Sequence, residues 1–555
     1  MKRDFDVIVV GGGISGCCAA LAASRRGADV LLIERYGFLG GTLTACGTGP
    51  MMTFHCGDMQ AVGGIMEEIV QRLTAKGLSP GHLLDTTGYT WTVTPFDAEG
   101  LKAELELMLL ESGASVLYHS WVTAVYSKCD NRIDAIRVVG KNAAVQYTGR
   151  CIVDATGDAD LSAMMQVVLT ARKRGLATGA VWSDALPALA EELAVLSGSS
   201  ACAAGSGLAR VYDKGDASDA GKQPADGAEH GAVADAGLSD AGEVSAVTGD
   251  RAEVGKQPAD DDAVLLVRKG RESDGKCQPV TMNFKVYGVD TEKLRRYIKE
   301  NPASFPRLAG RLNLIDRASR LSVGGFVEVL RQAQKDGRIS FAREDILLFE
   351  TNNPGEFIVN TSRVTGIDPL DPGQLTRAEI EGRRQCQQIF SVLKTDVPGF
   401  ADARIAFTGP MIGIRSSRQI IGRHTITEQE LLSRHMCCDA VACGAYPIDV
   451  HPPEGVDYDM FDTPRLPKNT CYYISYRALI GPIDNLITVG RCISTTFAAQ
   501  AAIRVSPIAG AIGQAGGVAA ALCASAGATV DRVPVALLRE VLIEQGAFLQ
   551  PQVTG

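Results

Sequence analysis

Histidine and arginine side chains at five positions could transfer a proton or bind an anion. His451 ends the segment YPIDVH at residues 446–451, and two prolines follow it. An imidazole held in such a rigid loop could donate a proton or clamp a substrate, or it could be purely structural. His55 follows a glycine-rich stretch at residues 42–54 and is a second candidate for a catalytic histidine.

Three arginines are candidates for binding a substrate. Arg415 and Arg418 are three residues apart, so on a helix they would share one face. Two guanidinium groups there could hold a carboxylate through paired hydrogen bonds, and salt bridges between domains are the alternative. Arg504 precedes a helix rich in small residues, where it could orient a substrate or form an ion pair at the helix start.

A glycine-rich turn near the N-terminus could cradle phosphate groups. Residues 6–10 (DVIVV) form a continuous apolar run, typical of a buried parallel strand. The segment GGGISG at 11–16 follows, and a helix rich in Ala and Leu then runs to a stop at Gly27. A second apolar run at 30–33 ends in Glu34. This order of strand, glycines, helix, strand and acid predicts a dinucleotide-binding fold.

Each part of this motif has a mechanical task. Gly11 permits the tight turn, Gly13 lets a pyrophosphate approach the backbone, and Gly16 lets the helix pack against the strand. The start of the helix offers unpaired N–H groups and a partial positive charge to the phosphates. Glu34 can accept hydrogen bonds from both hydroxyls of an adenosine ribose.

A second glycine pair favours FAD over NAD. Gly40, Gly41 and Thr42 follow Glu34 closely, and an extended FAD molecule needs a further close backbone approach beyond its ribose. The stretch ERYGFLGGTLT at 34–44 resembles the E-x-x-x-x-x-G-G signature of the glutathione-reductase-type FAD proteins. The motif and this resemblance together imply FAD contacts at Gly11, Gly13, Ile14, Ser15, Gly16, Glu34, Arg35, Gly40, Gly41, Thr42, Val122, Ala155, Thr156, Gly157, Asp158, Gly490, Arg491 and Gly513.

Sequence blocks in the middle of the chain are similar to a family of bacterial FAD-dependent oxidoreductases. They include FKVYGVD at 284–290, NTSR at 360–363 and GIRSSR at 413–418. That family is related to the flavin subunit of heterodisulfide reductase and, more distantly, to the fumarate reductase flavoproteins. The resemblance covers most of the chain except residues 170–280, and it implies a flavoprotein dehydrogenase or reductase.

The expected fold class is α/β, with a Rossmann-type FAD-binding domain that is discontinuous in sequence. A second, α+β domain should bind the substrate or cap the flavin. The expected boundaries are 1–75, 111–168 and 471–530 for the FAD-binding parts, 76–110 for a cap-domain excursion, 169–470 for the substrate domain, and 531–555 for a C-terminal helix or tail.

Local patterns predict several elements within these domains. Residues 115–125 and 281–289 should form strands. Asp290 should cap a helix, and Thr376 with Glu379 forms a capping-box pattern that predicts a second helix start.

Residues 201–262 differ in composition from the rest of the chain. They contain 13 acidic and 5 basic residues and few large apolar ones, and the hexapeptide GKQPAD occurs there twice, at 221–226 and 255–260. Such a segment cannot bury enough apolar surface to offset the entropy lost on ordering. We expect a flexible acidic insertion, with an acidic lid or docking arm as the alternative.

The 15 cysteines have irregular spacing and include no C-x-x-C pair. The pattern therefore predicts no metal site, and it does not support the iron–sulfur cluster that the family resemblance would allow. Neither His nor Cys lies between Glu34 and Gly41, so the usual attachment residue of a covalent flavin is missing there and we expect noncovalent FAD.

The charge balance disfavours polyanionic partners. There are 55 Lys and Arg residues against 64 Asp and Glu residues, a net charge of −9, and no basic cluster. Nucleic acid and anionic membrane surfaces are therefore poor candidates. No apolar stretch approaches the roughly 20 residues of a membrane span, and the N-terminal apolar run is too short for a signal peptide. We expect a cytoplasmic protein, and the sequence leaves its oligomeric state open.

The leading hypothesis is an enzyme that transfers a hydride between flavin N5 and a small organic substrate. The alternative is a flavoprotein that passes electrons to a partner protein, similar to the flavin subunit of heterodisulfide reductase. A flavin-dependent RNA-modifying protein, similar to the glucose-inhibited division protein, is disfavoured by the missing basic patch. The substrate and the direction of the reaction cannot be predicted from the sequence.

Overall fold

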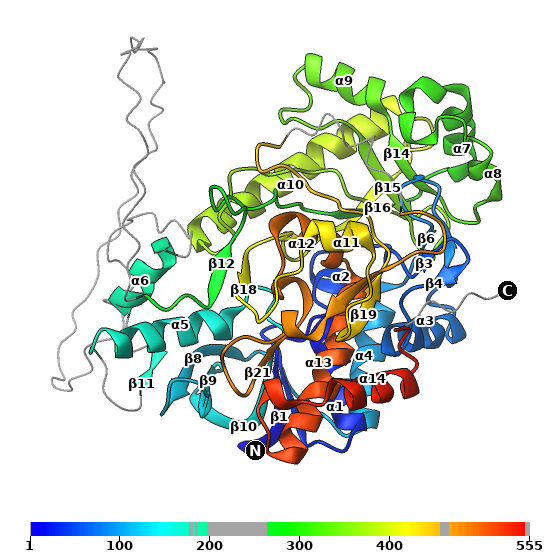
Figure 1. Ribbon diagram of the computed structural model, residues 1–555. Coiled ribbons are helices and arrows are strands. Elements are labelled where there is room, and N and C mark those ends of the chain that lie inside the picture. Colours follow the sequence, from blue (N-terminus) through cyan, green and yellow to red (C-terminus); the bar gives the residue numbers. More distant parts are fainter. Residues whose placement is uncertain (1, 177–180, 184–186, 197–262, 456–465, 550–555) are drawn as a thin grey trace, which may run out of the picture. The chain divides into compact units, whose positions relative to one another are not determined.

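Five parallel strands form the centre of the larger sheet in the computed structural model (Figure 1), which describes residues 2–176, 181–183, 187–196, 263–455 and 466–549. In spatial order they are β21 (Leu486–Thr488), β10 (Ala144–Asp154), β1 (Asp4–Val10), β2 (Val30–Ile33) and β7 (Ser115–Leu117). The first half of β10 also pairs antiparallel with β9 (Ala135–Val139), and β8 (Trp121–Ser127) and β11 (Val181–Trp182) extend that edge. The strand expected at 115–125 is thus two strands on opposite sides of the sheet: β7 is the edge strand on one side, and β8 lies between β9 and β11 on the other. His119, with a left-handed φ of 50°, lies between them.

Alternating residues of the central strands enter two different cores. Val7 and Val9 pack with the layer of α1 (Ile14–Arg25), α3 (Ile65–Ala75), α4 (Ala98–Ser112) and α13 (Ser506–Ala526). Ile8 and Val10 pack on the opposite face with α5 (Asp160–Lys173). The sheet is therefore covered on both faces, as parallel strands require.

Helices α1 and α13 come from opposite ends of the chain and lie side by side, blue against red in Figure 1. A Cβ atom on Gly513 would lie 2.1 Å from the carbonyl oxygen of Ser15, and one on Gly517 would lie 2.1 Å from that of Ala19. Glycine at these two positions lets the helix backbones touch. This contact joins the N-terminal and C-terminal parts of the chain in one layer of helices.

A second, antiparallel sheet has its own apolar core. Its strand order is β14 (Ser322–Gly325), β15 (Ile346–Glu350), β16 (Phe357–Val359), β13 (Phe284–Tyr287) and β17 (Arg404–Thr408). Its helices are α7 (Thr291–Glu300), α8 (Leu314–Arg317), α9 (Val327–Lys335) and α10 (Pro372–Asp396). The predicted fold class is confirmed: a mixed α/β chain with a parallel, Rossmann-type sheet at its centre.

Shorter elements connect these layers. They are α2 (Thr42–Ala45), α6 (Pro187–Leu196), α11 (Glu428–Ser433), α12 (Phe497–Ile503), α14 (Val535–Glu544), β3 (His55–Cys56), β4 (Met59–Gln60), β5 (Leu83–Leu84), β6 (Thr92–Val93), β12 (Val267–Lys269), β18 (Arg418–Ile420), β19 (Ala440–Gly444) and β20 (Tyr472–Ser475).

One predicted helix cap is confirmed and the other is wrong. Asp290 caps α7 by accepting a hydrogen bond from the Lys293 backbone N–H. In contrast, α10 begins earlier than expected, at Pro372, with Asp371 as its cap. Thr376 lies inside the helix and donates to the Pro372 carbonyl at 2.7 Å. The Asp-Pro pair, which presets the first turn, prevails over the capping-box pattern.

The predicted domain boundaries remain predictions. All described residues cluster in one compact unit. The boundaries near 110 and 168 fall inside α4, which ends at Ser112, and α5, which ends at Lys173. The acidic segment 201–262 lies outside the described residues.

Helix α13 corrects the expectation about apolar stretches. Among the described residues it is the one helix long and apolar enough to cross a membrane by length and composition. Most of it is buried inside the protein, as in a core helix. Its many Ala residues, with Ile, Val and Leu, make it apolar, and its Gly residues let it pack closely against α1.

Candidate active site

The carboxyl ends of the parallel strands open onto one cavity. Gly11, Glu34, Ala155 and Gly490 follow β1, β2, β10 and β21, and all four line a space of about 1190 Å³, part of it open to solvent. Ligands of doubly wound sheets bind at this edge. We call this space the first cavity. Its lining includes the predicted residues Gly11, Gly13, Ile14, Ser15, Glu34, Arg35, Gly41, Thr42, Val122, Ala155, Thr156, Gly157, Asp158, Gly490 and Arg491.

Glu34 is fixed with both carboxylate oxygens in use. Oε2 accepts from the Gly12 N–H at 2.6 Å, and Oε1 accepts from the Tyr36 N–H at 2.8 Å. Burial raises the pKa of the Glu34 carboxyl, and the two backbone hydrogen bonds act in the opposite direction. Each oxygen can still accept one more hydrogen bond, which fits the two adjacent hydroxyls of a ribose.

The three motif glycines serve different purposes. A Cβ on Gly11 would lie 2.5 Å from the Ala155 carbonyl oxygen, and one on Gly16 would lie 1.8 Å from that of Gly11, so both glycines are required by packing. At Gly13 the nearest protein atom would be Gly41 Cα at 3.8 Å, so this glycine keeps the cavity itself open. The first turn of α1 carries no acidic residue, and its positive end is therefore available to an anion.

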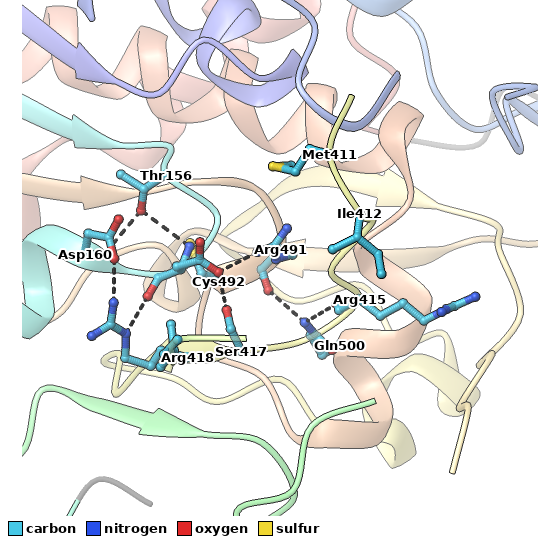
Figure 2. A network of polar contacts seen from close by, with 12 residues as sticks. Thr156, Asp160, Met411, Ile412, Arg415, Ser417, Arg418, Arg491, Cys492 and Gln500 are labelled. Atoms are coloured by element: carbon cyan, nitrogen blue, oxygen red, sulfur yellow. Dashed lines mark hydrogen bonds and ion pairs between the residues drawn. The ribbon is translucent and has the colours of Figure 1, made fainter. Parts of the chain in front are cut away.

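A polar network joins the first cavity to the segment before β18 (Figure 2). The Asp158 carboxylate accepts from Arg491 Nη2 and from Ser417 Oγ, both at 2.5 Å. Arg418 donates Nε to the Asp158 carbonyl at 2.8 Å and Nη2 to Asp160 at 2.5 Å. Burial opposes the charge of Asp158, but Arg491 and Arg418 lower its pKa below the usual range.

Arg415 and Arg418 do not share a helix face, contrary to the expectation. Arg418 begins β18 and the residues before it are not helical, so the two side chains diverge, as Figure 2 shows. Arg415 instead donates Nη1 to the Pro279 carbonyl and to Thr281 Oγ1, both at 2.6 Å. It lines a second cavity, whereas Arg418 belongs to the Asp158 network.

The second cavity adjoins the first and has a volume of about 900 Å³, part of it open to solvent. The two cavities share the lining residues Thr42, Ile414, Arg491, Arg504 and Ser506. Ser506 opens α13, whose first turn carries no acidic residue, so the positive end of that helix lies at the junction. Arg415, Asp449 and His451 are among the residues that line the second cavity alone.

Asp449 connects the polar side chains of the second cavity. Its Oδ2 lies 3.3 Å from His451 Nε2, 3.3 Å from the Tyr446 hydroxyl and 3.2 Å from Arg504 Nη2. Burial opposes the charge of Asp449, but His451, Arg504 and Arg415 hold its pKa well below the usual range. Asp449 is therefore an anion at neutral pH.

His451 is neutral at the same pH. Burial lowers its pKa to about 3, although Asp449 acts in the opposite direction. A neutral imidazole that donates Nε2–H to Asp449 keeps a lone pair on Nδ1. His451 can therefore accept a proton or a hydrogen bond at Nδ1.

Two buried glutamines link the loops that carry these residues. Gln500 Nε2 donates to the Arg415 carbonyl at 3.1 Å and to the Arg491 carbonyl at 3.5 Å. Gln278 Nε2 donates to Gln500 Oε1 at 3.2 Å, and Gln278 Oε1 accepts from the His451 N–H at 3.2 Å. One hydrogen-bond chain thus runs from the first cavity to the loop of His451.

Several sequence-predicted residues lie away from both cavities. His55 belongs to β3, and its ring packs 4.8 Å from the ring of His82, so the structure does not bring it to the site. Burial lowers the pKa of His55 to about 4. Gly513 contacts α1, and Gly40 donates its N–H to the Gly12 carbonyl at 2.9 Å. Both residues support the elements that line the first cavity but do not line it themselves.

Other residues of the site were not predicted. Asp449 lies two residues before His451, and this Asp-x-His spacing was a usable signal. Asn283, Asn360, Gln278 and Gln500 come from separate segments, and nothing local in the sequence marks them. In the part of the chain that the structure describes, there is no group of three or more His, Cys, Asp or Glu side chains that could hold a metal ion.

Comparison with known proteins identifies the family. A family model described as FAD dependent oxidoreductase matches residues 6–179 and 263–542. The chain therefore belongs to the FAD dependent oxidoreductase family. It is a flavoenzyme, and FAD is its cofactor.

Individual relatives are more distant. Aklavinone 12-hydroxylase DnrF of Streptomyces peucetius is 28% identical over 178 residues, which cover 28% of this chain and 36% of that protein. The soluble pyridine nucleotide transhydrogenase of Sodalis glossinidius is 42% identical over 66 residues, which cover 12% of this chain and 13% of that protein. The chain thus spans little more than a third of the length of the first relative.

Among solved structures, a geranylgeranyl bacteriochlorophyll reductase-like protein of Thermoplasma acidophilum is 10% identical, with 98% of this chain and 84% of that chain covered and a TM-score of 0.39. A point mutant of halogenase PltM in complex with FAD is 11% identical, with 98% and 72% covered and a TM-score of 0.38.

The residues of the first cavity fit FAD. Glu34 offers two acceptors for ribose hydroxyls, and Gly13 leaves space beside the start of α1 for a pyrophosphate. Arg491 and Arg504 line both cavities at their junction. The positive charge of these two guanidinium groups suits an anionic ligand.

Proposed function

We propose that the enzyme transfers a hydride between N5 of FAD and a small organic substrate held in the second cavity. The observation that carries this proposal is the shared lining at Thr42, Arg504 and Ser506, which lets a molecule in the second cavity touch a cofactor in the first. When bound, FAD supplies the two-electron redox chemistry. The side chains bind, orient and exclude water.

The proposed roles of the residues in the first cavity follow from the way they fit FAD. Glu34 holds the ribose hydroxyls, and the backbone around Gly13 with the start of α1 holds the pyrophosphate. The start of α13 and Arg504 place positive charge at the junction, where they stabilise negative charge on the reactive end of the cofactor.

In the second cavity, His451 moves the proton. Asp449 orients the ring through Nε2 and leaves Nδ1 as the acceptor. Arg415 and Arg504 line the same space and contact the substrate. His55 has no role in this proposal because it lies outside both cavities.

The test is to fill the second cavity while leaving the first intact. Asn360 lines only the second cavity, and its side chain can be enlarged in Asn360→Trp. Asn142, an exposed residue, provides the control Asn142→Trp. Oxidised holoprotein is mixed without air with panels of small alcohols, amines and acids, and flavin bleaching is followed by absorbance.

We expect Asn360→Trp to keep its FAD and its reduction by dithionite but to lose bleaching by whichever compound reduces the wild type. Bleaching at the wild-type rate would contradict the use of the second cavity. Electron transfer to a partner protein, as in the flavin subunit of heterodisulfide reductase, is the alternative function, and iron in the purified protein would favour it.

A further inference from the structure

Arg415 is a cation that lacks an anionic partner within hydrogen-bond distance among the described residues. Its two hydrogen-bond acceptors, the Pro279 carbonyl and Thr281 Oγ1, are both neutral and both bind Nη1. Nε and Nη2 have no partner in the described part of the chain, and unlike Nε of Arg491 and Arg504 they are not sealed by neighbouring atoms. Because Arg415 lines the second cavity, these two groups are open to it.

The open edge of Arg415 has the geometry of a carboxylate receptor. Nε–H and Nη2–H lie side by side on one edge of the planar guanidinium, at a spacing that matches the two oxygens of a carboxylate. The bonds of Nη1 fix the plane of the group, and the bond from Gln500 to the Arg415 carbonyl fixes its backbone. The receptor is therefore oriented before any ligand arrives.

The charges around Arg415 favour an anionic ligand. Burial lowers the pKa of Arg415, the neighbouring cations Arg504, Arg343 and Arg363 act in the same direction, and the Asp449 carboxylate opposes them. Positive charge therefore exceeds negative charge around Arg415, and a carboxylate bound there would reduce this excess.

A proton acceptor lies close to this receptor. Burial and the nearby Arg415 both lower the pKa of His451, whereas Asp449 acts in the opposite direction. The Gln500 and Gln278 side chains connect the Arg415 carbonyl with the His451 N–H. Arg415 and His451 thus lie close to each other on the wall of one cavity.

We infer that the substrate is a 2-hydroxy acid, whose carboxylate binds the open edge of Arg415 and whose hydroxyl faces His451 Nδ1. This inference rests on the proposed function. The C–H bond at carbon 2 breaks and its electron pair passes with the hydrogen to FAD, which is reduced. The hydroxyl proton passes to His451 Nδ1, a C=O bond forms, and the product is the 2-oxo acid. Reduction of the 2-oxo acid is the same reaction in reverse.

The test compares acids with their esters. Oxidised holoprotein is mixed without air with glycolate, lactate, malate and 2-hydroxyglutarate, and separately with their methyl esters. We expect at least one acid to bleach the flavin, and its ester to need about 100-fold more for half-maximal rate, the worth of two charge-assisted hydrogen bonds.

Variants separate binding from proton transfer. Arg415→Gln should raise the half-saturating acid concentration about 100-fold, and Arg415→Lys, which keeps the charge but loses the paired edge, about 10-fold. His451→Gln should instead lower the maximal rate, by about 100-fold. Arg404→Gln, at an exposed arginine of β17, is the matched control and should leave both values unchanged.

Four outcomes would overturn the inference. Equal bleaching by acid and ester, or bleaching by an uncharged alcohol or an amine alone, would exclude the Arg415 anchor and leave the proposed function standing. Bleaching by a 2-hydroxy acid that is unchanged in Arg415→Gln would do the same. If no small molecule of any class bleaches the flavin, the proposed function fails together with the inference.

Discussion

Carboxylates held in buried surroundings are the common feature of the site at the scale of single residues. Glu34 binds two backbone N–H groups, Asp158 binds Arg491, and Asp449 binds Arg504. Each acid lies just beyond a strand or within a loop where N–H groups or guanidiniums converge. The cost of burying each charge is offset locally, which leaves the remaining lone pairs for ligands.

The first prediction concerns Glu34. Glu34→Ala removes the two acceptors proposed for the ribose, so the affinity for FAD should fall about 100-fold. The measurement is the ratio of FAD to protein after gel filtration, together with a fluorescence titration. Glu300→Ala, at an exposed residue, is the control and should keep its FAD. A full flavin complement in Glu34→Ala would remove Glu34 from the ribose role.

The second prediction concerns pH and His451. Its folded-state pKa of about 3 lies below the usual 6.5, so folding excludes a proton. The stabilisation is complete above pH 6.5 and is lost as pH falls from there toward 3. His451→Gln cannot take up this proton, so between pH 6.5 and 5 it should lose about 2 kcal/mol less unfolding free energy than the wild type.

Urea unfolding at several pH values measures this difference. The comparison between the two proteins cancels the other titrating groups. Parallel pH profiles for the wild type and His451→Gln would show that His451 titrates normally and would contradict a neutral, buried imidazole.

Some residues of the site could be predicted from the sequence and others could not. The positions in the glycine motif and Glu34 were predictable because local geometry dictates them. The separate placement of Arg415 and Arg418 was not, because it depends on a non-helical segment held by Asp158 across the fold. His55 was misplaced because a short hairpin turns it toward His82.

At the scale of elements, the contact between α1 and α13 holds the site together. It places the start of α1 at the first cavity and the start of α13 at the junction of both cavities. The close approach depends on Gly513 and Gly517, where any side chain would meet the α1 backbone.

The third prediction tests this contact. In Gly513→Ala the new Cβ would lie 2.1 Å from the Ser15 carbonyl oxygen, so the helices must separate. We expect a loss of about 3 kcal/mol in unfolding free energy and weaker FAD binding, because the start of α1 moves. Thermal unfolding and FAD content measure both effects.

Gly140→Ala is the control for that substitution. The nearest atom to a Cβ on Gly140 would be the His119 carbonyl oxygen at 3.9 Å, so a methyl group fits there. If Gly513→Ala is as stable and as rich in FAD as this control, the two helices can separate without consequence and the account of α13 is wrong.

Elements were predictable where local signals agree. Strand β2 and the cap of α7 match the sequence because apolar runs and an Asp cap act within a few residues. The start of α10 and the break between β7 and β8 did not match, because a Pro-preset turn and a left-handed His119 prevail over the simpler pattern. The second cavity lay beyond prediction because its walls come from many separate segments.

At the scale of the whole molecule, the family match is interrupted. It covers residues 6–179 and 263–542 and omits the acidic stretch between them. The composition of residues 201–262, with 13 acidic residues and few large apolar ones, agrees with an insertion into the family fold.

The fourth prediction follows from that interruption. Deleting residues 201–262 should leave the FAD content and the melting temperature nearly unchanged, because the family match omits this stretch and its composition lacks the large apolar residues of a packed core. A fall of either quantity would show that the acidic segment contributes to the fold.

The most direct test of the central claim is the quantity of acid-released FAD and of iron in protein purified without air. The claim is that this chain alone carries the redox reaction, with FAD in the first cavity and substrate beside it in the second. It predicts one FAD per chain and no iron. FAD accompanied by several iron atoms per chain would contradict it and favour a flavoprotein that passes electrons to a partner.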